Sequence, residues 1–258
     1  MLAWITRGLA KGRITTAYPR EPERPADGFH GPVLVLEASD ADRELEWCCP
    51  TAAITVDAHR RLSLDHGRCI QCGECVRAAP HRFVFAQRYE TADRRREALV
   101  VGDTDRHAPS PGRPTLADQE RALKRSIHVR HIDTGSDGSE EWEVQALWNP
   151  YYDIQRLGFF LTAAPRHADI LLATGVVTPA MRSPLERTWA VMPEPKALVA
   201  VGTDACSGGL CAGDGETCSG IDAVLPVDVY VPGSPPSPIA ILDGLLLAAG
   251  LRDERRDR

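Results

Sequence analysis

The sequence predicts an α/β protein in two parts, with a small, cysteine-rich α+β module followed by an open, mostly parallel α/β sheet domain. Its 258 residues, 43% hydrophobic and 26% charged, suit a folded protein of about two domains. Five of the eight cysteines lie from Cys48 to Cys75 and the other three from Cys206 to Cys218. Strand-like and helix-like segments alternate only in the second half, so the two halves are interpreted separately.

Composition and charge exclude several classes of protein. The net charge of −6 disfavours nucleic acid as the main partner, because phosphate contacts need a concentrated basic surface. The longest apolar stretch, residues 239–251, is too short to cross a bilayer and contains Asp243. No targeting segment is predicted at the start of the sequence. We therefore expect a cytoplasmic protein with reduced thiols and no membrane span of its own.

The first part is predicted to cover residues 1–103 and a linker residues 104–120. Short extended runs are expected at 33–36, 53–56 and 98–101, as in a small module held together by bound ligands. Residues 103–114 are polar, contain three prolines and show no hydrophobic period, which is typical of a linker.

The second part is predicted to cover residues 121–252, followed by a tail at 253–258. Residues 127–132 alternate as a strand does, and the apolar runs 168–175 and 197–202 end in glycine, as expected of strands buried on both faces. Helices are expected between the strands and after them, at 153–163, 179–191 and 239–251. The carboxyl ends of the strands should gather residues 134–143, 176–177 and 203–209 into one region.

The strongest motif is the C-x2-C-x2-C run of Cys69, Cys72 and Cys75. In two-cluster bacterial ferredoxins this run continues x3-C-P, and the fourth cysteine ligates the other cluster. Here the fourth position is Ala79, followed by Pro80. The missing cysteine therefore belongs to the other cluster.

The complementary ligand is Cys49, which opens the C-P-T-x-A-I pattern that closes a first ferredoxin motif. Counting back from it reaches Leu45, Asp42 and Ser39, so the cluster that would need positions 39, 42, 45 and 79 has lost all four ligands. The sequence thus predicts one 4Fe–4S cluster bound by Cys49, Cys69, Cys72 and Cys75. Cys48 competes for the fourth corner, but Pro50 favours Cys49. Zinc and plain free thiols are the alternatives.

Two family resemblances follow from longer stretches. Residues 7–19 (RGLAKGRITTAYP) resemble the start of the ferredoxin subunits of energy-converting nickel–iron hydrogenases and their relatives in respiratory complex I. The second half resembles the small subunit of the same enzymes, the 20-kilodalton complex I subunit family. The matching stretches there are residues 125–136, 165–175, 207–209 and 226–236. The chain then resembles a fusion of two subunits.

In the 20-kilodalton family, four cysteines hold a cluster next to the large subunit. The resemblance places Asp137, Glu140, Asp204 and Ser234 where those cysteines would stand. Three interpretations remain open. The pocket persists as a scaffold without metal, or the four oxygen-bearing side chains bind a hard cation such as magnesium or calcium. In the third, Cys206, Cys211 and Cys218 form a displaced thiolate site.

The resemblance implies an iron–sulfur electron-transfer subunit of a membrane-associated, hydrogenase-like or complex I-like oxidoreductase complex. It would lack the cluster nearest the large subunit, and it would lie peripherally on the cytoplasmic face. Its partners would be a hydrogenase-like large subunit and membrane subunits. The alternative is a non-catalytic scaffold or redox-sensing module of such a complex. No nucleophile–base pair is predicted, so no catalytic residue is assigned.

Overall fold

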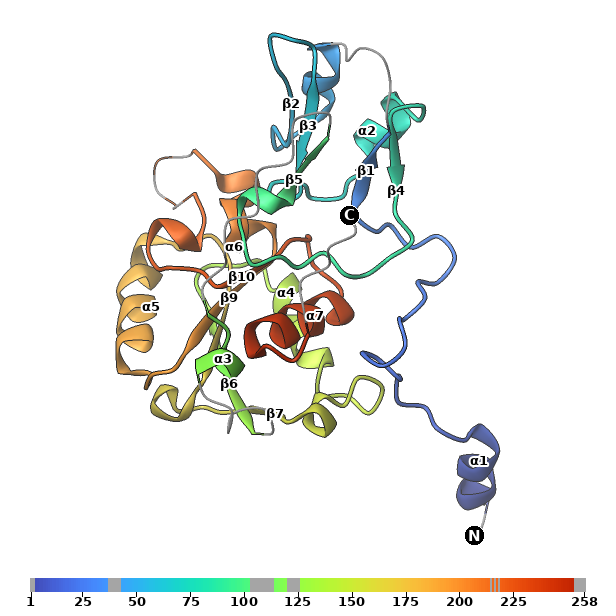
Figure 1. The fold of residues 1–258 in the computed structure, drawn as a ribbon, viewed down its shortest axis with the longest axis vertical. Helices are drawn as coiled ribbons and strands as arrows, with labels where there is room; N and C mark the ends of the chain where they lie inside the picture. Colours follow the sequence, from blue (N-terminus) through green and yellow to red (C-terminus); the bar gives the residue numbers. More distant parts are fainter. Residues whose placement is uncertain are drawn as a thin grey trace.

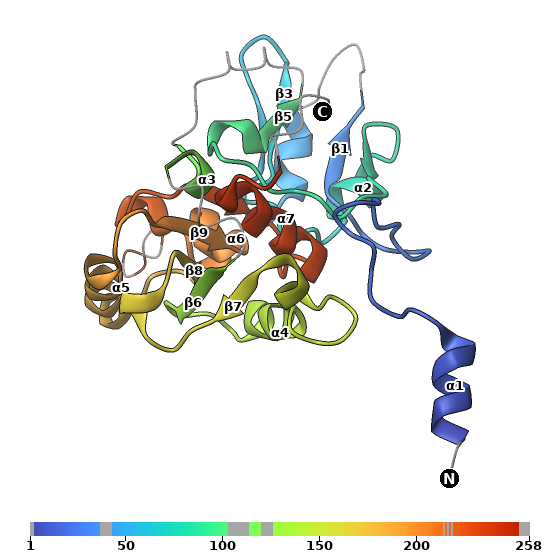
Figure 2. The same cartoon turned by 60° about the horizontal axis from the view of Figure 1, so that its bottom comes forward.

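A computed structural model of the chain describes residues 3–36, 43–102, 114–119, 126–213, 215, 217 and 219–252. Two small antiparallel sheets form one end of the molecule, and a larger sheet with its helices forms the other (Figure 1). A helix, α1 (Ala3–Lys11), projects away from both (Figures 1 and 2). No helix among the described residues has the length and apolar character needed to cross a bilayer.

The first half consists of short elements. Strands β1 (Val33–Val35) and β4 (Phe83–Phe85) pair antiparallel, and β2 (Ile54–Val56), β3 (Leu62–Asp65) and β5 (Val100–Gly102) form a three-stranded antiparallel sheet. The helical turns are η1 (Arg43–Cys48), α2 (Glu74–Ala78) and η2 (Glu97–Leu99). Apolar side chains of the strands, η1 and α2 share one small core, which also contains Cys69 and Cys75, whereas Leu99 of η2 packs in a core cluster of the second half.

The second half is built on a five-stranded parallel sheet in the order β10-β9-β8-β6-β7. The strands are β6 (Ile127–Asp133), β7 (Phe159–Leu161), β8 (Ile170–Thr174), β9 (Ala197–Val201) and β10 (Val229–Val231). All residues of β8 and β9 are buried. The parallel pairing of all five strands confirms the predicted sheet. The mainly apolar sequences of β8 and β9 suit strands that are covered on both faces.

Helices cover both faces of this sheet. The described helices are α3 (Leu116–Gln119), α4 (Ser139–Ala146), α5 (Pro179–Val191), α6 (Thr203–Ser207) and α7 (Pro238–Ala249), with 3-10 turns η4 (Ile154–Leu157), η5 (Pro165–His167), η6 (Gly209–Cys211) and η7 (Ile221–Ala223). Residues of α7, α4 and α3 pack against one face, and residues of α5 and α6 against the other. The predicted helices at 179–191 and 239–251 are confirmed as α5 and α7. Ser237 caps the start of α7, where its hydroxyl accepts a hydrogen bond from the Ala240 N–H at 3.3 Å. Gly250, in the left-handed conformation, caps the end of the helix.

The predicted helix at 153–163 is wrong. That segment forms the short turn η4, stops at Gly158, and continues as the edge strand β7. Gly158 has a φ of 89°, which ends the helical turn and redirects the chain. The following Phe159–Leu161 segment pairs with β6, with Ile127 opposite Phe159. Aromatic and branched side chains favour such a strand.

The two halves are interlocked. Tyr18, Ala92 and Leu116 all lie in the core of the second half. Asp93 and Tyr230 exchange two backbone hydrogen bonds, at 3.0 and 2.8 Å. Residues 104–113 and 120 of the predicted linker, and the tail at 253–258, lie outside the described residues. The described part of the linker, 114–119, packs on the second half instead of standing free, because Leu116 is fully buried there.

Candidate functional site

The structure brings all four predicted ligand cysteines around one cavity in the first half. Cys49, Cys69, Cys72 and Cys75 line it, together with Cys48. Apolar side chains from β1, β2 and β3 complete its walls, namely Val33, Ile54 and Leu64. All five cysteines are free thiols. Of the lost ligand positions, Leu45 and Ala79 are described, whereas Ser39 and Asp42 lie outside the described residues.

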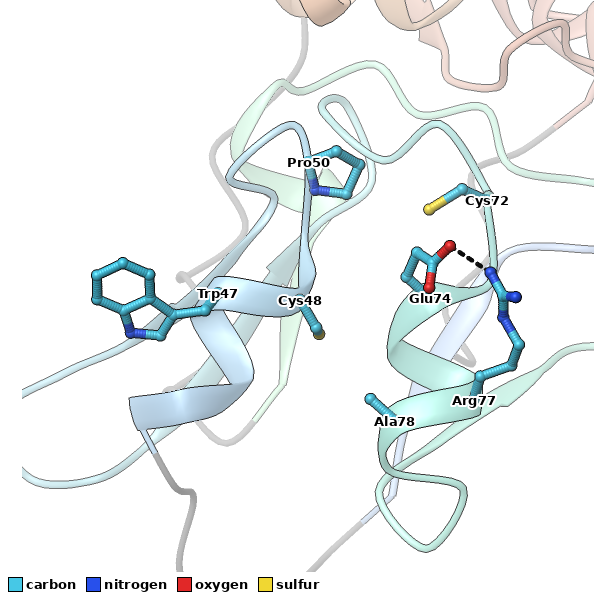
Figure 3. Close-up of a pocket in the computed structure, with 7 residues that line it drawn as sticks. All are labelled: Trp47, Cys48, Pro50, Cys72, Glu74, Arg77 and Ala78. Carbon is cyan, nitrogen blue, oxygen red and sulfur yellow. Dashed lines mark hydrogen bonds and ion pairs between the residues drawn. The ribbon is translucent and has the colours of Figure 1, made fainter.

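The cavity opens to the surface beside two of these cysteines. Cys48, at the end of η1, and Cys72, just before α2, also line an open pocket with Trp47, Glu74 and Arg77 (Figure 3). Cys72 and Trp47 are exposed, whereas Cys69 and Cys75 are buried. The five thiols therefore lie at different depths, from the buried Cys69 and Cys75 to the exposed Cys72.

Backbone conformation wraps the C-x2-C-x2-C loop around the cavity. Gln71 and Gly73 have φ values of 56° and 77°, both left-handed. A side chain at Gly73 would place its Cβ 3.1 Å from the Phe85 ring, so both the positive φ and this close approach favour glycine there. On the other wall, the Ala53 N–H donates to the Cys49 sulfur at 3.2 Å. Such N–H groups directed at sulfur stabilise thiolates and tune iron–sulfur clusters.

Burial keeps two of these thiols protonated in the metal-free protein. It raises the pKa of Cys69 to about 12 and that of Cys75 to about 11, and neighbouring thiols add to both shifts. Backbone N–H groups of Gln71 and Val76 act in the opposite direction. Metal binding at these sulfurs would therefore release protons, since the thiolate is the ligand form.

Four thiolates are the ligand set of a 4Fe–4S cluster and also of a structural zinc site. A zinc ion needs its four ligands to converge on one point, whereas a 4Fe–4S cubane takes one thiolate at each of four irons. The four predicted thiol ligands line one small cavity, with a volume of about 10 Å³. Within the described ranges, no three Cys, His, Asp or Glu side chains are grouped so that they could hold one metal ion.

Hydrogen bonds connect this loop to the second half. The buried Thr203 hydroxyl donates to the Cys69 carbonyl at 3.1 Å. The Arg96 guanidinium donates to both carboxylate oxygens of Asp65 at 2.7 Å and to the Cys206 carbonyl at 3.3 Å. Thr203 and Arg96 could not be predicted as supports of the site, because Cys69, Asp65 and Cys206, which they contact, lie far from them along the chain. Neither residue belongs to a local motif.

In the second half, Asp137, Glu140 and Asp204 lie at the carboxyl edge of the sheet, as expected. Glu140 is only 1% exposed, and its carboxylate accepts from the Ser139 hydroxyl at 3.1 Å. Burial, and less strongly the charges of Asp204 and Asp137, raise the pKa of Glu140 to about 7. Ser234 is exposed. These residues form no metal-binding group in the described part of the chain, so the structure offers the hard-cation interpretation no support.

A second set of polar side chains lies at the same edge. The Glu141 carboxylate accepts from the Ser136 hydroxyl at 2.7 Å and from the Thr174 hydroxyl. The His131 Nε2 atom lies 3.0 Å from the Thr174 hydroxyl, and burial lowers the pKa of His131. Internal hydrogen bonds hold these side chains together, as in a structural support.

The remaining cysteines do not form a common site in the described residues. Cys206, a residue of α6, is buried in the core, and Cys211 is exposed. Cys218 lies outside the described residues. The displaced thiolate site stays a prediction without structural support.

Replacing Glu140 by glutamine is expected to remove a pH dependence of stability. The folded protein holds the Glu140 proton up to about pH 7, whereas an unfolded chain loses it near the ordinary value of 4.5. Between these values the folded state binds more protons, so the free energy of unfolding falls by about 1.4 kcal/mol per pH unit as pH rises. Urea titrations across this pH range check the slope. Glu186→Gln, at an exposed position of α5, serves as the control, and equal slopes for both variants would contradict the prediction.

Comparison with known proteins gives a consistent set of relatives. The family model described as "NADH ubiquinone oxidoreductase, 20 Kd subunit" matches residues 138–248. Formate hydrogenlyase subunit 7 of Escherichia coli K12 is 42% identical over 135 residues, which are 52% of this chain and 53% of that protein. The chain thus spans about half the length of that relative.

Two further comparisons cover more of the matched protein. A Pyrococcus furiosus protein named "Probable membrane-bound hydrogenase subunit mbhJ" is 40% identical over 133 residues, 52% of this chain and 80% of that one. A chain of the archaeal membrane-bound sulfane sulfur reductase structure is 30% identical, with a TM-score of 0.44, and the match covers 50% of this chain and 75% of that chain.

Proposed function

Since this chain belongs to the family of the 20 Kd subunit of NADH ubiquinone oxidoreductase, we propose that it is an electron-transfer subunit of a membrane-associated oxidoreductase complex of the hydrogenase or complex I type. The proposed carrier is one 4Fe–4S cluster held by Cys49, Cys69, Cys72 and Cys75. In this proposal residues 1–103 are a ferredoxin-like module fused to the family domain at 121–252, which has no cluster of its own.

The cavity lined by the four thiols is the observation that carries this proposal. Cys49 lies twenty positions before Cys69 in the sequence, and the fold brings it to the same cavity as the loop at 69–75. The short antiparallel strands and helical turns around the cavity are compatible with a ferredoxin-like module. Its apolar walls exclude water from the buried sulfurs.

When bound, the cluster would supply one-electron transfer. The chain's own residues set the conditions for it. The thiolates of Cys69 and Cys75 hold the buried side, while exposed Cys72, with Trp47 nearby, gives a redox partner an approach from the surface. The Thr203 hydroxyl fixes the Cys69 carbonyl to the second half, which keeps the loop at a constant distance from α6.

The proposed partners are a hydrogenase-like large subunit, beside the second half, and membrane subunits. The two relatives named above as subunits, of formate hydrogenlyase and of a membrane-bound hydrogenase, support a multi-subunit assembly. In this proposal the chain lies peripherally on the cytoplasmic face of the membrane.

A scaffold or redox-sensing module is the second candidate. Asp137, Glu140 and Asp204 favour it, because carboxylates stand where the family resemblance implies cluster cysteines. An electron on the first half would then have no standard carrier to reach in the second half. In this case the cluster would act as a structural staple, and the second half would hold the complex together.

Reversible reduction is the expected outcome for the electron carrier. The full chain, purified without oxygen, should contain about four irons and four sulfides, and give one EPR signal after dithionite. Reoxidation should restore the visible absorbance with unchanged circular dichroism. Unfolding on reduction would favour the staple instead. About eight irons would contradict the single-cluster proposal, and zinc or no metal would contradict the cluster altogether.

A further inference from the structure

The segment that carries α1 is fixed to the body at its base. The Thr16 N–H donates to the Tyr151 carbonyl at 2.9 Å, and the Arg156 guanidinium donates to the carbonyls of Thr16 and Tyr18 at 3.0 and 2.6 Å. The buried Tyr18 hydroxyl donates to Asp243 at 3.1 Å. Before this anchor, residues 5–14 are all exposed, and α1 projects away from the rest of the molecule (Figures 1 and 2). We call residues 3–14 the arm.

The arm carries apolar and basic side chains on different sides. Ile5 and Leu9 are four residues apart and therefore share a face of α1, where they are 37% and 78% exposed. Arg7 and Lys11 have the same spacing but start two positions later, which rotates them about 200° around the helix axis. Exposed Ile14 follows the helix. An apolar face with an opposed basic face, on a helix whose described side chains at 5–11 are all exposed, indicates an external partner.

Charge identifies the kind of partner. Residues 1–20 contain four basic side chains, Arg7, Lys11, Arg13 and Arg20, and no aspartate or glutamate. The whole chain nevertheless carries a net charge of −6. A basic arm on an acidic protein is attracted to a negatively charged surface while the body is repelled from it. This restricts contact to the arm.

We propose that the arm binds the surface of an anionic lipid bilayer. Ile5, Leu9 and Ile14 enter the boundary between headgroups and acyl chains, and Arg7, Lys11 and Arg13 contact the phosphates. This combination of a short apolar face and basic side chains is that of helices that lie in the membrane interface without crossing it. The anchor at Thr16 and Tyr18 transmits this attachment to the second half. The proposal depends on the arm alone and holds whether or not the first half binds a cluster.

Flotation of the full chain with lipid vesicles tests this proposal. We expect the chain to float with phosphatidylcholine vesicles that contain phosphatidylglycerol, and to be released as salt is raised. The double variants Ile5→Glu/Leu9→Glu and Arg7→Glu/Lys11→Glu should each bind about tenfold more weakly or worse. Leu161→Glu, which changes a leucine 57% exposed on β7, is the matched control and should bind as the parent does.

Thermal unfolding and iron content of each variant separate binding from folding, because the substituted residues Ile5, Arg7, Leu9 and Lys11 are exposed and belong neither to the described core nor to the cysteine cavity. The proposal is overturned if the parent chain fails to float at low salt, or if the arm variants float as well as Leu161→Glu. Binding that is equally strong on pure phosphatidylcholine also overturns it. If the parent does not float but crosslinks through the arm to another subunit, the arm's partner is a protein.

Discussion

Replacing Cys69 by serine is expected to lower the bound iron from about four atoms per chain to a small fraction of that value. Cys69 lies on the buried side of the cavity with Cys75, and Cys48, the additional thiol at the cavity, comes from η1 and not from this loop. A serine hydroxyl is a much weaker ligand for iron because it stays protonated near neutral pH. Iron and acid-labile sulfide on the chain purified without oxygen measure the loss.

Cys49→Ser, Cys72→Ser and Cys75→Ser should have the same effect, and Cys48→Ser is the matched control. Cys48 lines the same cavity, but its thiol donates to the Leu45 carbonyl at 3.0 Å, and it directly precedes the predicted ligand. We expect Cys48→Ser to keep its iron. If Cys48→Ser loses iron and Cys49→Ser keeps it, the fourth ligand is Cys48 and the assignment of Cys49 is wrong.

Replacing Arg252 by methionine is expected to lower the free energy of unfolding by about 3 kcal/mol. The Arg252 guanidinium contacts the Asp243 carboxylate and the Tyr18 hydroxyl, and lies 3.5 Å from a Glu90 carboxylate oxygen. Asp243 is 4% exposed within the apolar helix α7, and Glu90 is also buried. Removal of the guanidinium would take away a cation that both buried carboxylates contact, and breaking a buried ion pair from one side is costly. Urea unfolding measures the change.

Arg182→Met is the control for this prediction. Its ion pair with Glu186, at 3.3 Å on α5, is exposed, so its loss should change the free energy of unfolding by less than about 0.5 kcal/mol. Equal effects of the two substitutions would show that the Arg252 cluster does not stabilise the fold. Since Tyr18 belongs to that cluster, Arg252→Met should also loosen the base of the arm.

The parallel sheet could be predicted because its signal is local. The strands β8 and β9 are apolar except for Thr174, the last residue of β8, and each is followed directly by a glycine. Helix α5 has the bounds predicted for it. The segment at 153–163 misled the prediction because its composition suits a helix, whereas pairing with β6 made its second part an edge strand. Tertiary pairing overrode a weak local preference there.

The predicted ligand set has the same local character. The spacing of Cys69, Cys72 and Cys75 and the position of Cys49 before Pro50 can be read from the sequence, and the structure places all four around one cavity. That Cys48 shares the cavity, and that Cys72 is exposed while Cys69 is buried, depends on how η1 and the loop before α2 pack together. No spacing rule contains that information.

The sequence by itself determined the central strands and the helices α5 and α7 of the second half, the candidate ligands of the first, and the family of the chain. These depend on short-range periodicity and spacing, which the chain carries wherever it folds. Only the tertiary structure decided how the halves interlock through Asp93 and Tyr230, how Thr203 holds the Cys69 carbonyl, and how Tyr18 anchors the segment from which α1 projects. The partners in these contacts lie more than a hundred residues apart, and only packing of the folded core brings them within hydrogen-bond distance.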